Sequence, residues 1–284
     1  MPPVRVVTVC GSLQARSGNL ALLESLPGLA PCDVEFSAFT GLRALPHFDL
    51  DLNEGEPPLA VRAWREALRS SDAVFMAAPE YGHSLPGALK NAVDWIFASG
   101  ELYRKPVAVT ASSPGPERGR RGLAALCQTL GALEAAVLGG EPIARGPGTD
   151  AAAARLLAQL VAAARRVRAG QPALPEIALP PFVEDVLRGT SLRGPLLTRL
   201  GAYDLAAPPT SDEVLAALAA LLADSVGGAP LDGPGLALAR LDAWVDGSEG
   251  ARALLDSLVG RLDESPALHA LLAALGPRAL ACLG

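Results

Sequence analysis

Short apolar runs alternate with amphipathic segments over the first 170 residues of the chain. The apolar runs, rich in Val and Ala, cover residues 4–10, 33–36, 72–79, 105–113 and 135–144. Runs of this length and composition predict strands that are covered on both faces, as in a parallel sheet. Hydrophobic positions at helical spacing predict helices over residues 17–27, 59–71, 85–96, 121–134 and 149–170. This alternation predicts an α/β fold with a doubly wound, five-stranded parallel sheet.

Two stretches lie outside this alternation. Residues 41–58 have no period and are rich in Pro, Asp and Gly, which predicts a long surface connection. Residues 171–181 contain four prolines and predict a linker, and residues 182–284 show helical patterns with no convincing strand. We therefore expect an α/β domain over residues 1–170, a Pro-rich linker over 171–181 and an all-helical C-terminal domain over 182–284, whose role the sequence does not indicate.

Composition narrows the class of function. The chain has 284 residues, of which 50% are hydrophobic and 19% charged, so it can bury a sizeable core. A net charge of −6 and an aromatic content of 4% disfavour binding to nucleic acid or to an anionic membrane. No uncharged apolar stretch is long enough to span a membrane, and the N-terminus runs straight into the first predicted strand. We expect a cytoplasmic protein with no nucleic-acid or membrane partner.

Charged residues are distributed unevenly, and potential metal ligands are scattered. Residues 171–284 carry 7 basic and 14 acidic side chains, whereas residues 1–170 carry 17 and 16. No CxxC pair is present, and the cysteines and histidines are far apart: Cys10, Cys32, Cys127, Cys282, His47, His83 and His269. We expect reduced thiols, most of them in the core, and no metal site.

Polar side chains gather where the first predicted strand meets the first predicted helix. The residues concerned are Ser12, Gln14, Arg16, Ser17 and Asn19. Ligands of parallel sheets bind beyond the carboxyl ends of the strands, and a helix N-terminus there offers free N–H groups to an anion. Hydroxyl, amide and guanidinium donors add to it, so the loop predicts a site for a terminal phosphate. The alternative is an ordinary polar turn with Ser17 as N-cap; neither a Walker loop nor GxGxxG is present.

Two further loops follow strands at the same predicted edge. The segment PEYGHSLPGALKNAVDW (79–95) follows the third strand, and SSPGPERG (112–119) follows the fourth. A planar ligand with a phosphate tail would contact all three loops. The alternative for the second loop is a plain strand-to-helix turn.

The segments GSLQARSGN and PEYGHSLPGALKNAVDW resemble the NADPH-dependent FMN reductase family, over about residues 4–170. The resemblance implies a flavodoxin-like fold with FMN and NADPH as cofactors. It assigns the FMN phosphate to Ser12, Ser17 and Asn19, with Gln14 and Arg16 as possible further donors. It places the isoalloxazine edge against Pro79, Glu80, Tyr81 and Gly82, largely through backbone groups. It places the opposite side of the flavin against Ser112, Ser113 and Gly115.

The chain departs from the family pattern at two positions. Gln14 stands where the family has Arg, so either Arg16 supplies the charge or FMN binds more weakly. Gly82 stands where the family has Asn. Gly serves equally well there only if the flavin needs the backbone N–H and not the amide side chain.

Basic residues in the third loop suggest a site for the nicotinamide cofactor. We expect one of Arg118, Arg120 and Arg121 to meet the 2′-phosphate of NADPH, the alternative being a solvated helix start. His83 would be a general acid at the mouth of the site, or simply an exposed loop residue. For Leu89, Asn91, Asp94 and Trp95 we expect packing roles rather than chemistry.

The resemblance implies transfer of hydride from NADPH to flavin N5, and then of electrons to a quinone, free flavin, metal oxyanion or azo compound. It also implies a homodimer or homotetramer. Two alternatives remain open: a flavodoxin-like electron carrier, and a flavin-free interaction or scaffold protein with a degenerate site. The C-terminal helices would be a lid, an oligomerisation arm or a docking module for a partner enzyme.

Overall fold

The computed structural model describes residues 2–115 and 118–174, with six isolated positions beyond them (179, 196, 200, 213, 214 and 217). The chain divides into two units, residues 1–175 and 176–284. Only the first unit has its elements described. The predicted all-helical region and most of the predicted linker therefore lie outside the described residues.

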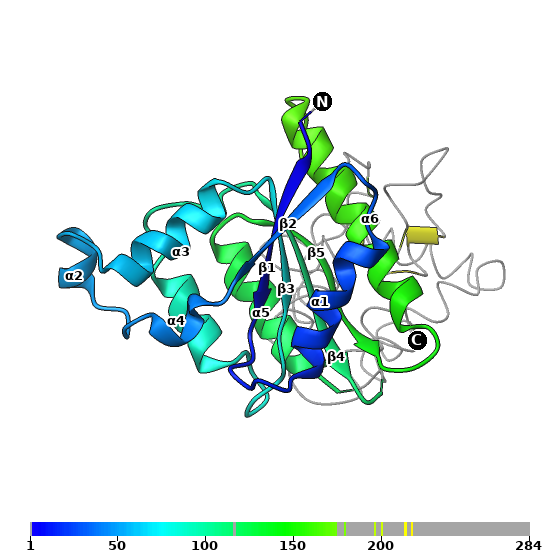
Figure 1. Cartoon of the computed structure of the whole chain (residues 1–284), viewed down its shortest axis with the longest axis horizontal. Coiled ribbons are helices and arrows are strands. Elements are labelled where there is room, and N and C mark those ends of the chain that lie inside the picture. Colours follow the sequence, from blue (N-terminus) through cyan, green and yellow to red (C-terminus); the bar gives the residue numbers. More distant parts are fainter. Residues whose placement is uncertain are drawn as a thin grey trace, which may run out of the picture. The chain divides into compact units, whose positions relative to one another are not determined.

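A single five-stranded sheet forms the centre of the first unit (Figure 1). Its strands are β1 (Val4–Cys10), β2 (Val34–Phe39), β3 (Ala73–Ala77), β4 (Pro106–Ser113) and β5 (Ala136–Ala144). All neighbouring pairs are parallel, in the order β2-β1-β3-β4-β5, which confirms the predicted parallel sheet. This order is that of flavodoxin-like sheets, in which the crossovers diverge between β1 and β3. The carboxyl ends of these two strands therefore mark the expected ligand site.

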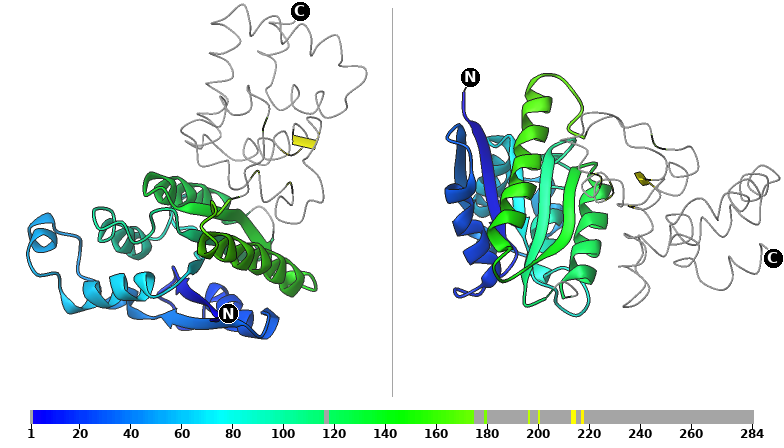
Figure 2. Two further views of the ribbon diagram at one scale, coloured as in Figure 1. Left: turned by 90° about the horizontal axis from the view of Figure 1, so that it is seen from above. Right: turned by 90° about the vertical axis from the view of Figure 1, so that its right-hand side faces the viewer.

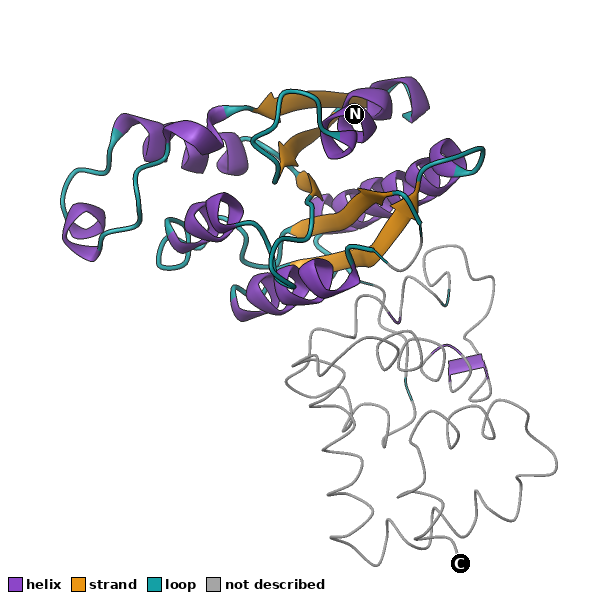
Figure 3. Cartoon of the chain, turned by 90° about the horizontal axis from the view of Figure 1, so that it is seen from below, coloured by secondary structure: helices purple, strands orange, loops and turns teal. Residues whose placement is uncertain are grey.

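Helices cover both faces of the sheet (Figure 2). On one face lie α1 (Gly18–Leu29) and α6 (Thr149–Arg168), and on the other lie α3 (Leu59–Arg69), α4 (Gly87–Asp94) and α5 (Arg120–Ala132). Figure 3 shows the strands as a layer with helices on either side. The doubly wound arrangement predicted from the alternation is therefore confirmed.

The strands supply alternate residues to the two faces. The face covered by α3, α4 and α5 contains one buried cluster, whose strand members include Val7, Val9, Val74, Met76, Val107 and Val109. The intervening residues Val6, Phe75, Ala108 and Leu138 are also buried. Both faces of the sheet are thus apolar, which explains why the strands appear in the sequence as continuous apolar runs.

Strand β2 is longer than its apolar run predicts. The sequence indicated residues 33–36, but the ladder with β1 continues to the pair Val9–Phe39. Ser37 and Ala38 are exposed because β2 is an edge strand. Hydrophobicity therefore does not mark the end of this strand, which is set by its backbone pairing with β1.

The predicted structureless connection contains two short helical elements. The η1 turn covers Gly41–Ala44 and α2 covers Leu50–Glu54. Asp49 caps α2, since its carboxylate accepts the Asp51 N–H at 2.9 Å. Figure 1 shows α2 projecting away from the sheet, and we name residues 46–58 the arm.

The base of the arm is fixed to α4. The carbonyl oxygen of Pro46 accepts hydrogen bonds from Asn91 Nδ2 and Trp95 Nε1, each at 2.8 Å. The Asn91 side-chain oxygen accepts the N–H of Phe48 at 2.8 Å, and the Phe48 ring meets the Trp95 ring edge-on. The packing roles predicted for Asn91 and Trp95 agree with these contacts.

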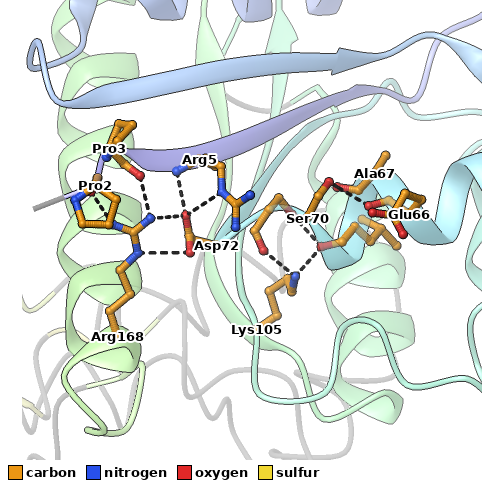
Figure 4. A network of polar contacts seen from close by, with 11 residues as sticks. Pro2, Pro3, Arg5, Glu66, Ala67, Ser70, Asp72, Lys105 and Arg168 are labelled. Atoms are coloured by element: carbon orange, nitrogen blue, oxygen red, sulfur yellow. Dashed lines mark hydrogen bonds and ion pairs between the residues drawn. The ribbon is translucent and has the colours of Figure 1, made fainter.

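The last helix is tied to the first strand (Figure 4). Arg168, in the final turn of α6, contacts the Asp72 carboxylate through Nε at 3.0 Å and Nη2 at 2.6 Å. The same guanidinium donates to the carbonyl oxygens of Pro2 and Pro3. Asp72 also accepts the backbone N–H of Arg5 at 2.7 Å. These bonds join the two ends of the described fold.

Candidate functional site

The loop after β1 is held close against β3. The Gly11 N–H donates to the Ala77 carbonyl at 2.8 Å, and a Cβ at Gly11 would lie 2.8 Å from Ala78 Cβ. Only glycine permits this approach. The Ser12 hydroxyl oxygen is buried and accepts the Gln14 N–H at 3.2 Å, and Ser17 Oγ caps α1 by accepting the Asn19 N–H at 3.2 Å. The loop is thereby bent over the N-terminus of α1.

Several backbone donors of this loop have no acceptor. Within the part of the chain that the structure describes, no hydrogen bond is found for the N–H groups of Leu13, Ala15, Arg16 and Ser17, whereas the Ser12 N–H is directed at the Cys10 thiol. They precede a helix of 12 residues, whose dipole favours a negative charge at this end. The Arg16 and Gln14 side chains are exposed beside them. These donors fit a phosphate group.

Asn19 joins the first loop to the third. Its side chain is only 4% exposed, and its oxygen accepts the Ser112 N–H at 2.7 Å. The sequence predicted a direct phosphate contact for Asn19. The structure uses its oxygen to hold β4 against α1, which leaves only the Nδ2 donor for a ligand.

The second loop, after β3, turns through two residues in the left-handed region. Tyr81 and Ser84 exchange two backbone hydrogen bonds of 3.0 Å, and the residues between them, Gly82 and His83, have φ of 56° and 63°. Positive φ at both central positions is the requirement of a type I′ turn, which Gly meets without strain and Asn nearly so. The replacement of the family's Asn by Gly82 therefore preserves the backbone. In the described residues the N–H groups of Gly82 and His83 have no acceptor.

Glu80 fixes this turn to α5. Its Oε2 accepts the N–H groups of Arg121 at 3.0 Å and Gly122 at 3.2 Å, at the positive end of the helix dipole. A Cβ at Gly122 would lie 2.9 Å from Glu80 Cα, so the two segments are in close contact. The Glu80 side chain thus positions the loop, and these two N–H groups are not available to NADPH.

His83 lies at the surface, with 72% of its side chain exposed. Its Nδ1 is 2.9 Å from Arg121 Nη1 and 3.3 Å from Glu80 Oε1. A guanidinium only donates, so the contact with Arg121 requires Nδ1 to accept, whereas a hydrogen bond to Glu80 requires Nδ1 to donate. The role of His83 as a general acid therefore stays a prediction.

The third loop, after β4, is held in shape by a hydrogen bond from one of its own side chains. Ser113 is buried, and its hydroxyl donates to the Gly115 carbonyl at 2.5 Å. Arg118 is exposed, and its backbone N–H contacts Gly115 at 3.4 Å. Of the predicted flavin contacts here, Ser112 and Gly115 are partly exposed, whereas the hydroxyl of Ser113 is committed to the loop.

Arg145, which the sequence did not single out, reaches the same edge from β5. Its N–H donates to the Ser113 carbonyl at 2.8 Å. Its Nη1 lies 3.6 Å from the position that a Cβ on Gly18 would occupy, and Ser112 Oγ lies 3.0 Å from that same position. The sequence feature that could have identified Arg145 is the segment ARGPGT (144–149), which is basic, contains Gly and Pro, and follows the fifth strand. Because ligands bind beyond the carboxyl ends of parallel strands, this segment also belongs to the edge where the site is expected.

A cavity of about 550 Å³ lies on the other side of the first loop. It is lined by that loop, by α1, by β2 and by the residues after β2, and it includes Ser12, Leu13, Gln14, Leu23, Phe36 and Arg43. None of residues 79–82 or 112–115 lines it. The cavity is therefore distinct from the predicted positions of the flavin ring, although Ser12 and Gln14 of the predicted phosphate loop line it. Cys10 also lines it, and burial raises the pKa of this thiol.

Across residues 2–115 and 118–174, no three His, Cys, Asp or Glu side chains gather as metal ligands. Nor does any helix in the described part of the chain have the length and hydropathy of a membrane span.

Comparison with known proteins identifies a family with this architecture. The sequence model of the NADPH-dependent FMN reductase family matches residues 4–150, just over half of the chain. The quinone reductase of Escherichia coli (strain K12) is 38% identical over 138 residues, which are 48% of this chain and 73% of that protein. An NAD(P)H-dependent FMN reductase of Pseudomonas aeruginosa is 35% identical over 131 residues, 45% of this chain and 69% of that one.

A solved structure is also similar. It is FerB, a flavoenzyme NAD(P)H:(acceptor) oxidoreductase of Paracoccus denitrificans, with 32% identity and a TM-score of 0.44 over 48% of this chain and 75% of that chain. The extent of the family match and the identity to the curated relatives decide the assignment. The chain therefore belongs to the NADPH-dependent FMN reductase family, and is a flavodoxin-like oxidoreductase with FMN and NADPH as its cofactors.

Proposed function

We propose that the chain reduces a quinone-like acceptor with NADPH, using FMN bound at the carboxyl edge of the sheet. The observation that carries this is the set of unpaired N–H groups in residues 13–17 at the N-terminus of α1. The Asn19–Ser112 bond supports it further, because it holds the first and third loops side by side. Free flavin and other electrophilic acceptors are the alternatives within the same chemistry.

The phosphate would bind the N–H groups of the first loop, with Ser12, Ser17 and Arg16 around it. The flavin ring would lie between the turn of residues 79–82 and the loop of residues 112–115. The N–H groups of Gly82 and His83 are the donors suited to the ring edge, because they have no acceptor within the described residues. When bound, the flavin would supply the redox chemistry, which is hydride acceptance from NADPH and electron transfer to the acceptor.

The protein's own residues orient the reactants and exclude water. Glu80 and Gly122 hold the second loop at a fixed distance from α5, so the ring edge meets preset donors. Arg118 and Arg120 are our candidates for the 2′-phosphate of NADPH. Arg121 is the weaker candidate because its guanidinium contacts His83.

We also propose a homo-oligomer in which the arm contributes to the interface. The arm and its flank expose four large apolar side chains, Phe48, Leu50, Leu52 and Leu59. Exposed apolar side chains grouped in this way are typical of interaction surfaces. Light scattering of the Leu50→Asp/Leu52→Asp protein is expected to show a smaller assembly than the unchanged chain. The cytoplasmic location, and a partner enzyme bound by the C-terminal region, stay predictions.

The deciding experiment is the visible absorption spectrum of the purified full chain, with FMN added if needed, before and after anaerobic NADPH. A reductase shows flavin bands that NADPH bleaches and that a quinone restores. Flavin bands that NADPH leaves unchanged would indicate an electron carrier. A colourless protein that does not bind added FMN would indicate an interaction protein with a degenerate site.

A further inference from the structure

We propose that Arg145 binds the FMN phosphate and supplies the positive charge that Gln14 lacks. The inference rests on the proposed function, because it concerns how the flavin is held. It adds a binding residue from the end of β5, more than 120 residues along the chain from the first loop.

The backbone fixes where Arg145 starts. The strand pairing of β4 with β5 runs to Ser113 and Ala144, and the Arg145 N–H then donates to the Ser113 carbonyl at 2.8 Å. Ser112, one residue earlier in β4, is bonded through its N–H to Asn19 at 2.7 Å. Arg145 is thus connected to the start of α1 through two short, well-placed hydrogen bonds.

The guanidinium of Arg145 lies close to the start of α1. Nη1 of Arg145 lies 3.6 Å from the position of a Cβ on Gly18, and Ser112 Oγ lies 3.0 Å from it. Gly18 is the first residue of α1 and follows the unpaired N–H groups of residues 13–17. An anion bound by those groups would have Arg145 and the Ser112 hydroxyl within reach.

Within residues 2–115 and 118–174, the positive charge of Arg145 has no ionic partner. Arg145 is exposed and makes no ion pair with any described carboxylate. Without Arg145, the positive side chains near the first loop are the exposed Arg16 and Arg43, and Nη2 of Arg43 is already bonded to the Leu13 carbonyl. A guanidinium donates two parallel hydrogen bonds to a phosphate, which suits Arg145 to this position.

The test compares FMN with riboflavin, which has the same ring and no phosphate. Dissociation constants are measured for the full chain by quenching of flavin fluorescence. Arg145→Ala is expected to weaken FMN binding about 10- to 100-fold, the loss of a charge-assisted hydrogen bond, and to change riboflavin binding less than about twofold. Arg155→Ala is the matched control, because Arg155 is an exposed arginine of α6 and its removal changes the net charge equally.

A second variant tests whether Arg145 takes the place of the family's arginine. Gln14→Arg, introduced into Arg145→Ala, is expected to recover most of the lost FMN affinity. Failure to recover it would overturn this part of the inference. Equal loss of FMN and riboflavin in Arg145→Ala, or no loss of either, would overturn the phosphate contact. An unchanged chain that binds no FMN would instead refute the proposed function itself.

Discussion

At the scale of single residues, backbone conformation decides which residue types the second loop tolerates at position 82. Gly82 and His83 both have positive φ, and nothing lies within 4 Å of a Cβ at Gly82. Space is therefore available for a larger side chain, and only the left-handed backbone limits the choice. Asn adopts this region with little strain, whereas a β-branched residue does so at a cost of about 1–2 kcal/mol.

Two substitutions at Gly82 separate the backbone from the side chain. Gly82→Asn is expected to leave the free energy of unfolding within about 0.5 kcal/mol, whereas Gly82→Val should lower it by about 1–2 kcal/mol. Urea denaturation gives both values. FMN affinity is measured alongside, and Gly82→Asn should retain it because the N–H groups of residues 82 and 83 are unchanged. An equal loss of stability in the two variants would refute the left-handed turn.

Burial sets the reactivity of the thiols. Burial raises the pKa of Cys127 to about 12, whereas Cys32 is exposed. The thiolate is the reactive form, so at pH 8 Cys127 is almost entirely unreactive. In a Cys282→Ser background, which removes the cysteine outside the described residues, a chromogenic disulfide reagent should label Cys32 quickly and Cys10 slowly. Cys127 should react only after urea is added, and rapid labelling of it in the native protein would contradict its burial.

At the scale of elements, α4 is the support for the arm. Asn91 bonds both the carbonyl of Pro46 and the N–H of Phe48, so one side chain satisfies two backbone groups of a segment 45 residues away. The arm has few other described bonds to the sheet. Its order therefore depends on α4 more than on its own helix, α2, which has only 5 residues.

Removing the Asn91 amide should loosen the arm selectively. Asn91→Ala is expected to increase amide hydrogen exchange in residues 46–58 and to lower the free energy of unfolding by about 1–3 kcal/mol, because the Phe48 N–H loses its partner and the Pro46 carbonyl keeps only Trp95 Nε1. Lys90→Ala, which removes an exposed pair with Asp94 on the same helix, is the control and should leave exchange in the arm unchanged. Faster exchange spread evenly over the whole sheet would show that Asn91 supports the core instead.

The alternation of apolar runs was sufficient to predict the sheet and its helices, because hydrophobic spacing is a local property that burial on both faces makes visible. The conformation of the arm could not be predicted in this way, since its base is held by Asn91 and Trp95, which are remote in sequence. The same limit applies to the site. The positions of the site loops could be predicted from the ends of the strands. The use of Glu80 as a cap for α5 and the approach of Arg145 to Gly18 could not, because they depend on tertiary contacts.

At the scale of the whole described unit, the Asp72 cluster joins elements from both ends of the chain segment. Burial pushes the pKa of Asp72 upward, but the hydrogen bonds from Arg168 and from the Arg5 N–H outweigh it and hold the pKa below its ordinary value of 3.8. A carboxylate with a depressed pKa stabilises the native state above its unfolded pKa. That contribution is lost as the pH falls through the native pKa.

Asp72→Asn should therefore change stability in a pH-dependent way. At pH 7 we expect a loss of about 1–3 kcal/mol, because Arg168 loses its ionic partner while the shape of the side chain is kept. The unfolded chain takes up a proton on Asp72 near pH 4, whereas native Asp72 does so only below its ordinary pKa of 3.8, so the two proteins should converge as the pH falls through the lower native pKa. Urea unfolding between pH 2.5 and 7 in a Trp244→Phe background reports this unit, since Trp64 and Trp95 then supply the fluorescence.

The matched control for this substitution is Asp33→Asn, which breaks the pair between Asp33 and Arg165 on the same helix, α6. Both partners of that pair are about half exposed, so solvent screens it and its removal should cost less than about 1 kcal/mol at any pH. A difference for Asp72→Asn that stays constant from pH 7 to pH 2.5 would show that it acts by packing and not by charge. Convergence at low pH would instead establish that the ionic contact between Asp72 and Arg168 holds the last helix, α6, against the first strand, β1.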